Sequence, residues 1–208
     1  MKIAIDGPAG VGKTSVGRAL AEVFGCRFIS TGSMYRVVAV AFDRGMALDG
    51  VRIDVSDDGR FLLNGEDITD LLHTPEYDEK SSQVATRPAV RSRLVELQRE
   101  LAARNDVVME GRDIGTVVLP DADVKLFLQA SPAIRADRRL KQRGAGDREA
   151  TLKEIRRRDR RDKGRAVAPL KPARDATIID TDRKTLVEVI SVASNLVREQ
   201  LGKRCHGG

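Results

Sequence analysis

Short apolar runs alternate with longer amphipathic stretches along most of the chain. Five runs have the length of strands, and they lie at residues 2–6, 27–30, 106–109, 124–128 and 176–180. Between them, apolar residues recur every three or four positions, which is the period of a helix with one buried face. Strands that alternate with helices form a parallel sheet covered on both faces. The pattern predicts an α/β protein of three layers with a five-stranded parallel sheet.

Helices are predicted where this period continues for ten or more residues. They cover residues 14–24, 34–45, 77–104, 132–143, 148–163 and 186–201. Arg87-Pro88 interrupts the third stretch, so two helices or a kink are expected there. Thr31 or Ser33 is the expected N-cap of the second helix, and the chain from Gly202 onward is expected to fray.

A different period appears after the second predicted helix. Val51, Ile53 and Val55 alternate with polar residues, which is the period of a strand. Two strong turn sequences flank the next apolar run: Ser56-Asp57-Asp58-Gly59 and Asn64-Gly65. This stretch predicts a small antiparallel β-hairpin inserted into the α/β protein.

The stretch that follows the first apolar run fits G-x-x-x-x-G-K-[ST], a loop that cradles phosphates with inward-turned backbone N–H groups. In this pattern the Lys13 ammonium bridges the β- and γ-phosphates, and the Thr14 hydroxyl binds Mg²⁺. The helix N-terminus adds its dipole. A strand before the loop and a helix after it favour this reading over a plain glycine-rich turn. The expected ATP-binding residues are Gly7, Pro8, Ala9, Gly10, Val11, Gly12, Lys13, Thr14 and Ser15.

Composition narrows the class of protein. The length of 208 residues suggests one domain over residues 1–208, and with 3% aromatic residues its core must be aliphatic. No apolar run approaches the roughly 18–20 residues that span a bilayer. The chain enters a strand directly, so no signal peptide is expected. Cys26 and Cys205 form no C-x-x-C, which argues against a metal site or a disulfide framework and fits a cytoplasmic protein.

The net charge of +6 is concentrated in one segment. Residues 135–165 hold 14 Lys/Arg against 6 Asp/Glu, and the rest of the chain is slightly acidic. Helical spacing would place Arg158, Asp162 and Arg165 on one face, which can hold phosphates while the carboxylate accepts from a sugar hydroxyl. We therefore expect an Arg-rich helical lid over residues 140–165. The alternatives are a solvated basic helix and a nucleic-acid surface.

Other features separate the classes of protein that share a phosphate loop. No Asn-Lys-x-Asp guanine reader is present, which argues against a GTPase, and a motor or helicase is usually larger. The scarcity of aromatic residues argues against base stacking on single-stranded nucleic acid. A small-molecule kinase needs an acceptor site and mobile cations that close over the transferring phosphoryl group. The basic segment can supply these cations.

Six stretches, in order along almost the whole chain, carry a resemblance to a known family. They are residues 5–13 (IDGPAGVGK), 31–36 (TGSMYR), 82–85 (SQVA), 111–118 (GRDIGTVV), 158–162 (RDRRD) and 165–170 (RAVAPL). The phosphate loop is generic, but GRDIGT and RAVAPL are specific. Together they resemble the bacterial cytidylate kinases, which are P-loop nucleoside monophosphate kinases.

The resemblance implies transfer of the γ-phosphoryl group of ATP to CMP or dCMP, with Mg²⁺ as the cofactor. It also implies an inserted acceptor-nucleotide-binding region over residues 31–104. We further expect a monomer that binds neither nucleic acid nor a membrane.

By position, the resemblance implies that Arg91, Asp113 and Ser82 read the cytosine edge. The base suits them, because its exocyclic amine donates to a carboxylate and its O2 and N3 accept from an arginine. Uracil would turn O4 toward Asp113, and two facing acceptors cost on the order of 1–3 kcal/mol.

The remaining implied site residues hold phosphate, sugar or metal. The acceptor's phosphate would contact Arg36, Arg112 and Arg165. The sugar would lie near Arg158 and Asp162, and Thr31 is a further CMP contact. The implied catalytic residues are Lys13, Arg112, Arg158 and Arg165. Thr14 and Glu110 would hold Mg²⁺, Glu110 by orienting its waters.

Alternatives to these roles stay open at this point. The structural ones are an Arg112–Asp113 ion pair, an exposed Arg91, a Ser82 hydroxyl without a ligand and a Tyr35 that is plain core. His73 and His206 belong to no motif, so no general base is assigned to them. For the whole protein, the alternatives are a kinase for UMP or another small acceptor, an ATP-dependent nucleic-acid-binding protein and a non-catalytic nucleotide sensor.

Overall fold

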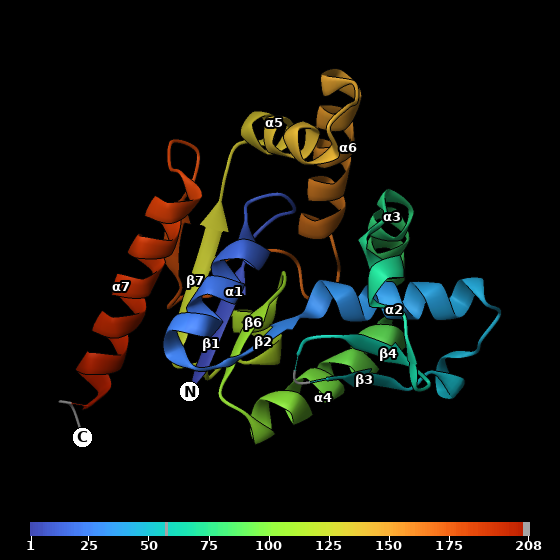
Figure 1. Ribbon diagram of the computed structural model, residues 1–208, viewed down its shortest axis with the longest axis horizontal. Coiled ribbons are helices and arrows are strands. Elements are labelled where there is room, and N and C mark those ends of the chain that lie inside the picture. The colour runs from blue at the N-terminus through green and yellow to red at the C-terminus, as the bar shows by residue number, and fades with distance from the viewer. Residues whose placement is uncertain (57, 206–208) are drawn as a thin grey trace.

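The computed structural model describes residues 1–56 and 58–205, and Figure 1 shows how its elements are arranged. At its centre is a parallel sheet in the strand order β2-β6-β1-β7-β8. The strands are β1 (Lys2–Asp6), β2 (Arg27–Ser30), β6 (Val107–Glu110), β7 (Val124–Gln129) and β8 (Thr177–Asp180). The predicted five-stranded parallel sheet is confirmed.

Alternate residues of a strand point to opposite sides of the sheet, so each face carries apolar side chains. Helices cover both faces. Ile3 and Ile5 of β1 pack in an aliphatic cluster with two helices, and Ala4 between them packs in a second cluster on the other face. The first face carries α1 (Lys13–Phe24) and α7 (Leu186–Cys205), and the second carries α2 (Thr31–Asp43) and α4 (Pro88–Arg104). The three predicted layers are therefore present.

An excursion leaves the main fold between α2 and α4. It holds a three-stranded antiparallel sheet in the order β3-β4-β5. Its elements are η1 (Leu48–Gly50), β3 (Ile53–Val55), β4 (Phe61–Leu63), β5 (Glu66–Asp67), η2 (Thr69–His73) and α3 (Pro75–Val84). Asn64 and Gly65 both have positive φ, 52° and 89°, as a two-residue hairpin turn requires. The predicted hairpin is confirmed, and Asp57 of the first predicted turn lies outside the described residues.

The basic segment forms two helices beyond the carboxyl end of β7. They are α5 (Pro132–Arg143) and α6 (Arg148–Lys163), and α6 lies beside α3 (Figure 1). Gly144 ends α5 with a φ of +73°, a left-handed conformation that favours glycine. The segment that follows β6 contains a π-helical turn, η3 (Ile114–Val118).

The start of α2 differs from the prediction. The helix begins at Thr31, directly after β2, and its N-cap is Ser30. Neither Thr31 nor Ser33 caps it, because both already lie inside the helix. The Thr31 hydroxyl donates instead to the backbone oxygen of Glu110, at 2.8 Å.

The end of the chain also differs. Gly202 does not begin a frayed tail, because it keeps a helical backbone and α7 continues to Cys205. Gly25, by contrast, takes the left-handed conformation and ends α1. Residues 206–208, including His206, lie outside the described residues.

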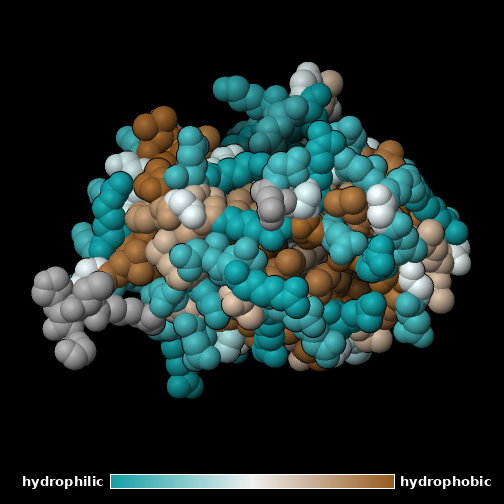
Figure 2. Space-filling model, turned by 60° about the horizontal axis from the view of Figure 1, so that its bottom comes forward, coloured by the Kyte–Doolittle hydropathy of each residue, from teal (hydrophilic) through white to brown (hydrophobic). Residues whose placement is uncertain are grey.

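Hydrophilic residues cover most of the face that Figure 2 shows, and hydrophobic residues lie among them in separate groups. Leu186, Val187 and Val192 of α7 are among the exposed large hydrophobic residues. Within residues 1–56 and 58–205, no helix has both the length and the apolar character needed to cross a membrane.

Candidate active site

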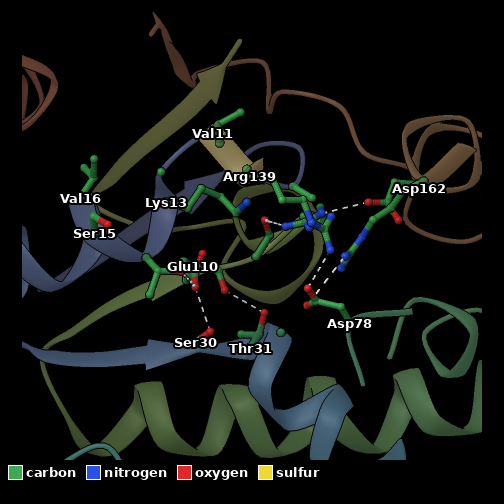
Figure 3. Close-up of a pocket in the computed structure, with 18 of the residues that line it drawn as sticks. Val11, Lys13, Ser15, Val16, Ser30, Thr31, Asp78, Glu110, Arg139 and Asp162 are labelled. Atoms are coloured by element: carbon green, nitrogen blue, oxygen red, sulfur yellow. Dashed lines mark hydrogen bonds and ion pairs between the residues drawn. The ribbon is translucent and has the colours of Figure 1, made fainter. Parts of the chain in front are cut away.

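A cavity of about 760 Å³ opens beyond the carboxyl ends of β1, β2 and β6, where ligands of open α/β sheets bind. Its wall is formed by the phosphate loop, α2, α3, α4, α5, α6 and the segment between β8 and α7. Figure 3 labels residues of the phosphate loop, α2, α3, α5 and α6 among them. Ten lysine or arginine side chains and four carboxylates line it. This surplus of positive charge suits a ligand with several phosphate groups.

The phosphate loop turns sharply between β1 and α1, as its pattern predicts. Gly7 has a φ of +147°, and an added Cβ would lie 2.2 Å from the carbonyl oxygen of Leu128, so a side chain does not fit. Residues 9–15 line the cavity, whereas Gly7 and Pro8 shape the loop behind it. Because α1 begins at Lys13, its N-terminus and positive dipole end lie at the cavity.

Lys13 is buried and extends into the cavity (Figure 3). Its ammonium group donates to the Pro8 carbonyl oxygen at 2.8 Å. Burial, followed by the nearby Arg112 guanidinium, lowers the pKa of Lys13 to about 7. A bound phosphate would favour the charged ammonium.

Two hydroxyl groups meet the carboxylate that ends β6. Thr14 Oγ1 donates to Glu110 Oε1 at 2.7 Å, and Ser30 Oγ donates to the same oxygen at 2.8 Å (Figure 3). A hydroxyl and a carboxylate are oxygen donors of the kind that Mg²⁺ prefers. Among the described residues, no group of three or more His, Cys, Asp or Glu side chains could hold a metal ion. A magnesium ion here therefore needs further oxygens, which nucleotide phosphates and water supply.

The three residues predicted to read the base all line the cavity. Arg91 Nη2 donates to Asp113 Oδ2, and both side chains are buried. Arg91 is 4% exposed, so it is not the exposed helix residue of the alternative reading. Ser82 is also buried, and its hydroxyl accepts from Arg161 Nη1 of α6 at 2.9 Å. Sequence reasoning did not foresee this contact with α6.

Asp162 organises the arginines beside this pair. Its side chain is 1% exposed, and it accepts from Arg112 Nε at 3.0 Å and from Arg165 Nη2. The alternative pairing of Arg112 with Asp113 is therefore not the one formed. Arg165 lies beyond α6, which ends at Lys163, so the expected helical face of Arg158, Asp162 and Arg165 is wrong for its last member.

Several donors of this cluster have no protein partner. The Nε atoms of Arg36, Arg158 and Arg165 are buried and form no hydrogen bond with the described part of the chain. A buried hydrogen-bond donor without an acceptor lowers the stability of a protein. Three of them in one cavity favour an anion as the ligand.

Tyr35 and His73 had been assigned no chemistry. Tyr35 packs against the hydrophobic cluster of α2 and α4 and also lines the cavity, and burial raises its pKa to about 12. Tyr35 is therefore neutral at physiological pH. His73 lies in η2 and is not part of the cavity wall.

Sequence reasoning missed one part of the cavity wall, which is formed by α5 and the start of α7. Arg138 of α5 donates to Thr181 at two atoms, with 2.9 Å between its Nη1 and the threonine hydroxyl. Lys184, Thr185 and Leu186 continue this wall at the start of α7. The only signal in the sequence was the density of basic residues in α5, which does not tell which of them face inward.

Asp78 and Arg135 were also missed. Asp78 of α3 lines the cavity among arginines. Arg135 of α5 is 2% exposed and forms two hydrogen bonds with Asp159 of α6, one of them 3.0 Å long. The same guanidinium donates to the Ala9 carbonyl oxygen at 3.1 Å, so it joins α6 to the phosphate loop.

Similarity to solved structures supports the fold. A gluconokinase from Sinorhizobium meliloti 1021 matches with a TM-score of 0.57 and 19% identity, over all of this chain and 97% of that chain. A shikimate kinase from Bacteroides thetaiotaomicron matches with a TM-score of 0.52 and 14% identity, over 95% of this chain and 98% of the other. At such identities the likeness concerns the fold alone.

Similarity in sequence is much higher. The cytidylate kinase of Mycobacterium leprae (strain Br4923) is 47% identical over 96% of both chains. That of Pelotomaculum thermopropionicum is 44% identical over 97% of both chains. A profile of the family described as "Cytidylate kinase" matches residues 3–199. This chain belongs to the cytidylate kinase family.

Proposed function

We propose that this protein transfers the γ-phosphoryl group of ATP to CMP or dCMP, giving ADP and CDP or dCDP. One observation carries the proposal beyond family membership. A phosphate loop and a buried Arg91–Asp113 pair line the same cavity, and a cluster of arginines completes its wall. Such a cavity has room for a donor nucleotide, an acceptor nucleotide and the charge that develops between them.

ATP binds with its phosphates on residues 7–15. Backbone N–H groups and the N-terminus of α1 face the phosphate oxygens. Lys13 leaves the Pro8 carbonyl oxygen and bridges the β- and γ-phosphates. The adenosine lies against the part of the wall that Arg138 and the start of α7 form.

The cytosine of the acceptor is read by Asp113 and Arg91. Asp113 accepts from the exocyclic amine, and Arg91 donates to O2 and N3. To contact the base, the two side chains lose part of their contact with each other. Ser82 adds a hydroxyl once Arg161 releases it.

The phosphate and sugar of the acceptor contact the arginines of the cavity. Arg36, Arg112 and Arg165 hold its phosphate, and the unpaired Nε atoms of Arg36 and Arg165 supply donors for this anion. The sugar hydroxyls lie near Arg158 and Asp162. Thr31, whose hydroxyl lies at the carboxyl end of β6, is a further contact.

Thr14 and Glu110 are the residues that would hold Mg²⁺. The hydroxyl of Thr14 would bind the ion, and Glu110 would orient its waters. When bound, Mg²⁺ neutralises charge on the β- and γ-phosphates and so favours departure of ADP.

The protein accelerates transfer by positioning and charge. An oxygen of the acceptor's phosphate bonds to the γ-phosphorus while the bond to the bridging β-oxygen breaks. This oxygen is already anionic, so no histidine is needed as a general base. Lys13, Arg112, Arg158 and Arg165 stabilise the charge that spreads over the transferring group.

Each region of the chain has one part in this scheme. Residues 1–208 form a single kinase domain, within which residues 31–104 bind the acceptor nucleotide. Residues 140–165 are the lid, which closes over both nucleotides and keeps water from the γ-phosphate. The protein works as a cytoplasmic monomer on small nucleotides, not on nucleic acid or membranes.

Product analysis tests this proposal. The protein is mixed with ATP, Mg²⁺ and CMP, and the nucleotides are separated by chromatography. ADP and CDP should appear in equal amounts, and omission of Mg²⁺ should abolish both. ADP that appears with inorganic phosphate in place of CDP would identify an ATPase and refute the proposal.

A further inference from the structure

Asp78 lies on α3, and its carboxylate points to a group of arginines in the cavity (Figure 3). Arg36 Nη2 donates to Oδ1 at 2.5 Å, and Arg139 Nη2 donates to Oδ2 at 2.9 Å. Arg158 Nη1 lies 3.9 Å from Oδ1. The three arginines belong to α2, α5 and α6, so one carboxylate connects the acceptor region with both helices of the basic segment.

These contacts resemble the contacts that arginines make with a phosphate group. Carboxylate and phosphate oxygens both accept from the fork of a guanidinium group. Arg36 and Arg158 are among the residues that we propose to hold the acceptor. Their Nε atoms stay unpaired within the described residues, so Asp78 satisfies these two side chains only in part.

Asp78 is charged at neutral pH. Burial acts to raise its pKa, but the guanidinium groups of Arg36, Arg158 and Arg139 prevail and hold the pKa of Asp78 below its usual range. Two anions in one cluster of arginines repel each other and compete for the same donors. A nucleotide phosphate therefore has to displace the Asp78 carboxylate from at least part of its contacts.

Glu79, the next residue of α3, allows a comparison. Its carboxylate accepts from Arg161 Nη2 at 2.8 Å and lies 3.4 Å from Arg157 Nη2. It also connects α3 with α6, but it is not part of the cavity wall, and its two arginines are not proposed phosphate ligands. Contact between α3 and the lid can thus be separated from occupation of the phosphate-binding arginines.

We propose that Asp78 is a built-in competitor for the phosphate group of the acceptor nucleotide. In the free protein its carboxylate occupies arginines that receive this phosphate, and the nucleotide displaces it on binding. The inference rests on the proposed function, because it takes the ligand to be a nucleoside monophosphate. Asp78 then lowers the affinity for the acceptor, and it does so through the phosphate and not through the base or sugar.

The test compares CMP with cytidine, which lacks the phosphate. Binding of each is measured without ATP by calorimetry or by NMR titration, for the wild type, Asp78→Asn and Glu79→Gln. Asparagine keeps the size of the side chain and removes its charge. Asp78→Asn should bind CMP about three- to tenfold more tightly, in line with loss of one partly screened charge contact. Its affinity for cytidine should not change, and Glu79→Gln should keep the wild-type ratio of the two dissociation constants.

Unchanged or weaker CMP binding by Asp78→Asn would overturn the inference, because Asp78 would then be holding the arginines in place for the phosphate. A gain for Glu79→Gln equal to that of Asp78→Asn would also overturn it. Asp78→Ser provides a second neutral variant with a shorter side chain, for which the same gain is expected. If the wild type binds no CMP, the proposed function itself fails. If the wild type binds CMP and neither neutral variant gains affinity, only this inference fails.

Discussion

At the scale of single residues, the charged groups of the cavity pair with one another. Arg91 donates to Asp113, and Asp162 accepts from Arg112 and Arg165. Such internal pairs compensate charges that are buried in the cavity. They also hold each donor and acceptor close to the place where the proposed nucleotide needs it.

Asp113→Asn tests whether this carboxylate reads the base. An amide can turn its N–H toward O4 of uracil, but it loses the charged acceptor for the amine of cytosine. We expect kcat/KM for CMP to fall about 10- to 100-fold, which corresponds to about 1–3 kcal/mol, and kcat/KM for UMP to fall much less. The ratio of the two values is independent of the folded fraction of the variant. Equal losses for both acceptors would show that Asp113 does not read the base.

Asp6 makes stability depend on pH. Burial raises its pKa to about 6, although the N–H groups of Gly115 and Ile114 act in the opposite direction. The folded protein therefore binds a proton that the unfolded chain, with a pKa of 3.8, does not yet bind. This group stabilises the fold as pH falls through about 6 toward about 4, and the contribution is lost as pH rises.

Urea unfolding of the wild type and Asp6→Asn measures this effect, because other carboxylates cancel in the difference. Between about pH 6.5 and about pH 4.5, the free energy of unfolding of the wild type should rise by about 2 kcal/mol relative to the variant. A difference that stays constant, or that moves in the other direction, would contradict the raised pKa of Asp6.

At the scale of elements, one buried arginine joins both helices of the basic segment to the phosphate loop. Arg135 of α5 binds Asp159 of α6 and the carbonyl oxygens of Ala9 and Ala130. The phosphate loop and α6 therefore share one guanidinium group. In the proposed closure, this contact would keep α6 in position relative to the phosphates of ATP.

Arg135→Ala should lower the free energy of unfolding by about 3–5 kcal/mol, because it leaves the Asp159 carboxylate and two carbonyl oxygens without their partner. The matched control is Arg148→Ala, whose ion pair with Asp137 also joins the two helices but lies on the surface. Arg148→Ala should lower the free energy of unfolding far less, because surface ion pairs are screened by solvent. Urea unfolding measures both variants. Equal losses would mean that Arg135 is not the anchor of the lid.

At the scale of the whole molecule, the sequence was a good guide to the parallel sheet and to where ligands collect. Residues such as Lys13, Glu110 and Arg112 each follow or end a strand, and parallel strands bring their carboxyl ends to one edge. Helix-length periods likewise predicted α1, α4 and α7, because their buried faces pack on the sheet. Gly144 and Arg87-Pro88 marked real helix boundaries for local steric reasons.

What the sequence did not predict depends on contacts between distant elements. Arg112 and Asp113 are neighbours in sequence, yet their partners lie on two different helices. Arg112 binds Asp162 of α6, and Asp113 binds Arg91 of α4. Asp78 belongs to no motif, and only its position among three arginines makes it notable. The predicted end of α6 at Lys163 is confirmed, so Arg165 lies beyond the helix and its position needed the structure.

The most direct test of the central claim ranks the acceptors. ADP release is followed with ATP, Mg²⁺ and, in separate assays, CMP, dCMP, UMP, AMP and GMP, and kcat/KM is determined for each. A cavity in which Asp113 and Arg91 read cytosine predicts the highest values for CMP and dCMP, a lower value for UMP, and the lowest for the purine nucleotides. Values for CMP and dCMP that do not exceed those for AMP or GMP would contradict this account.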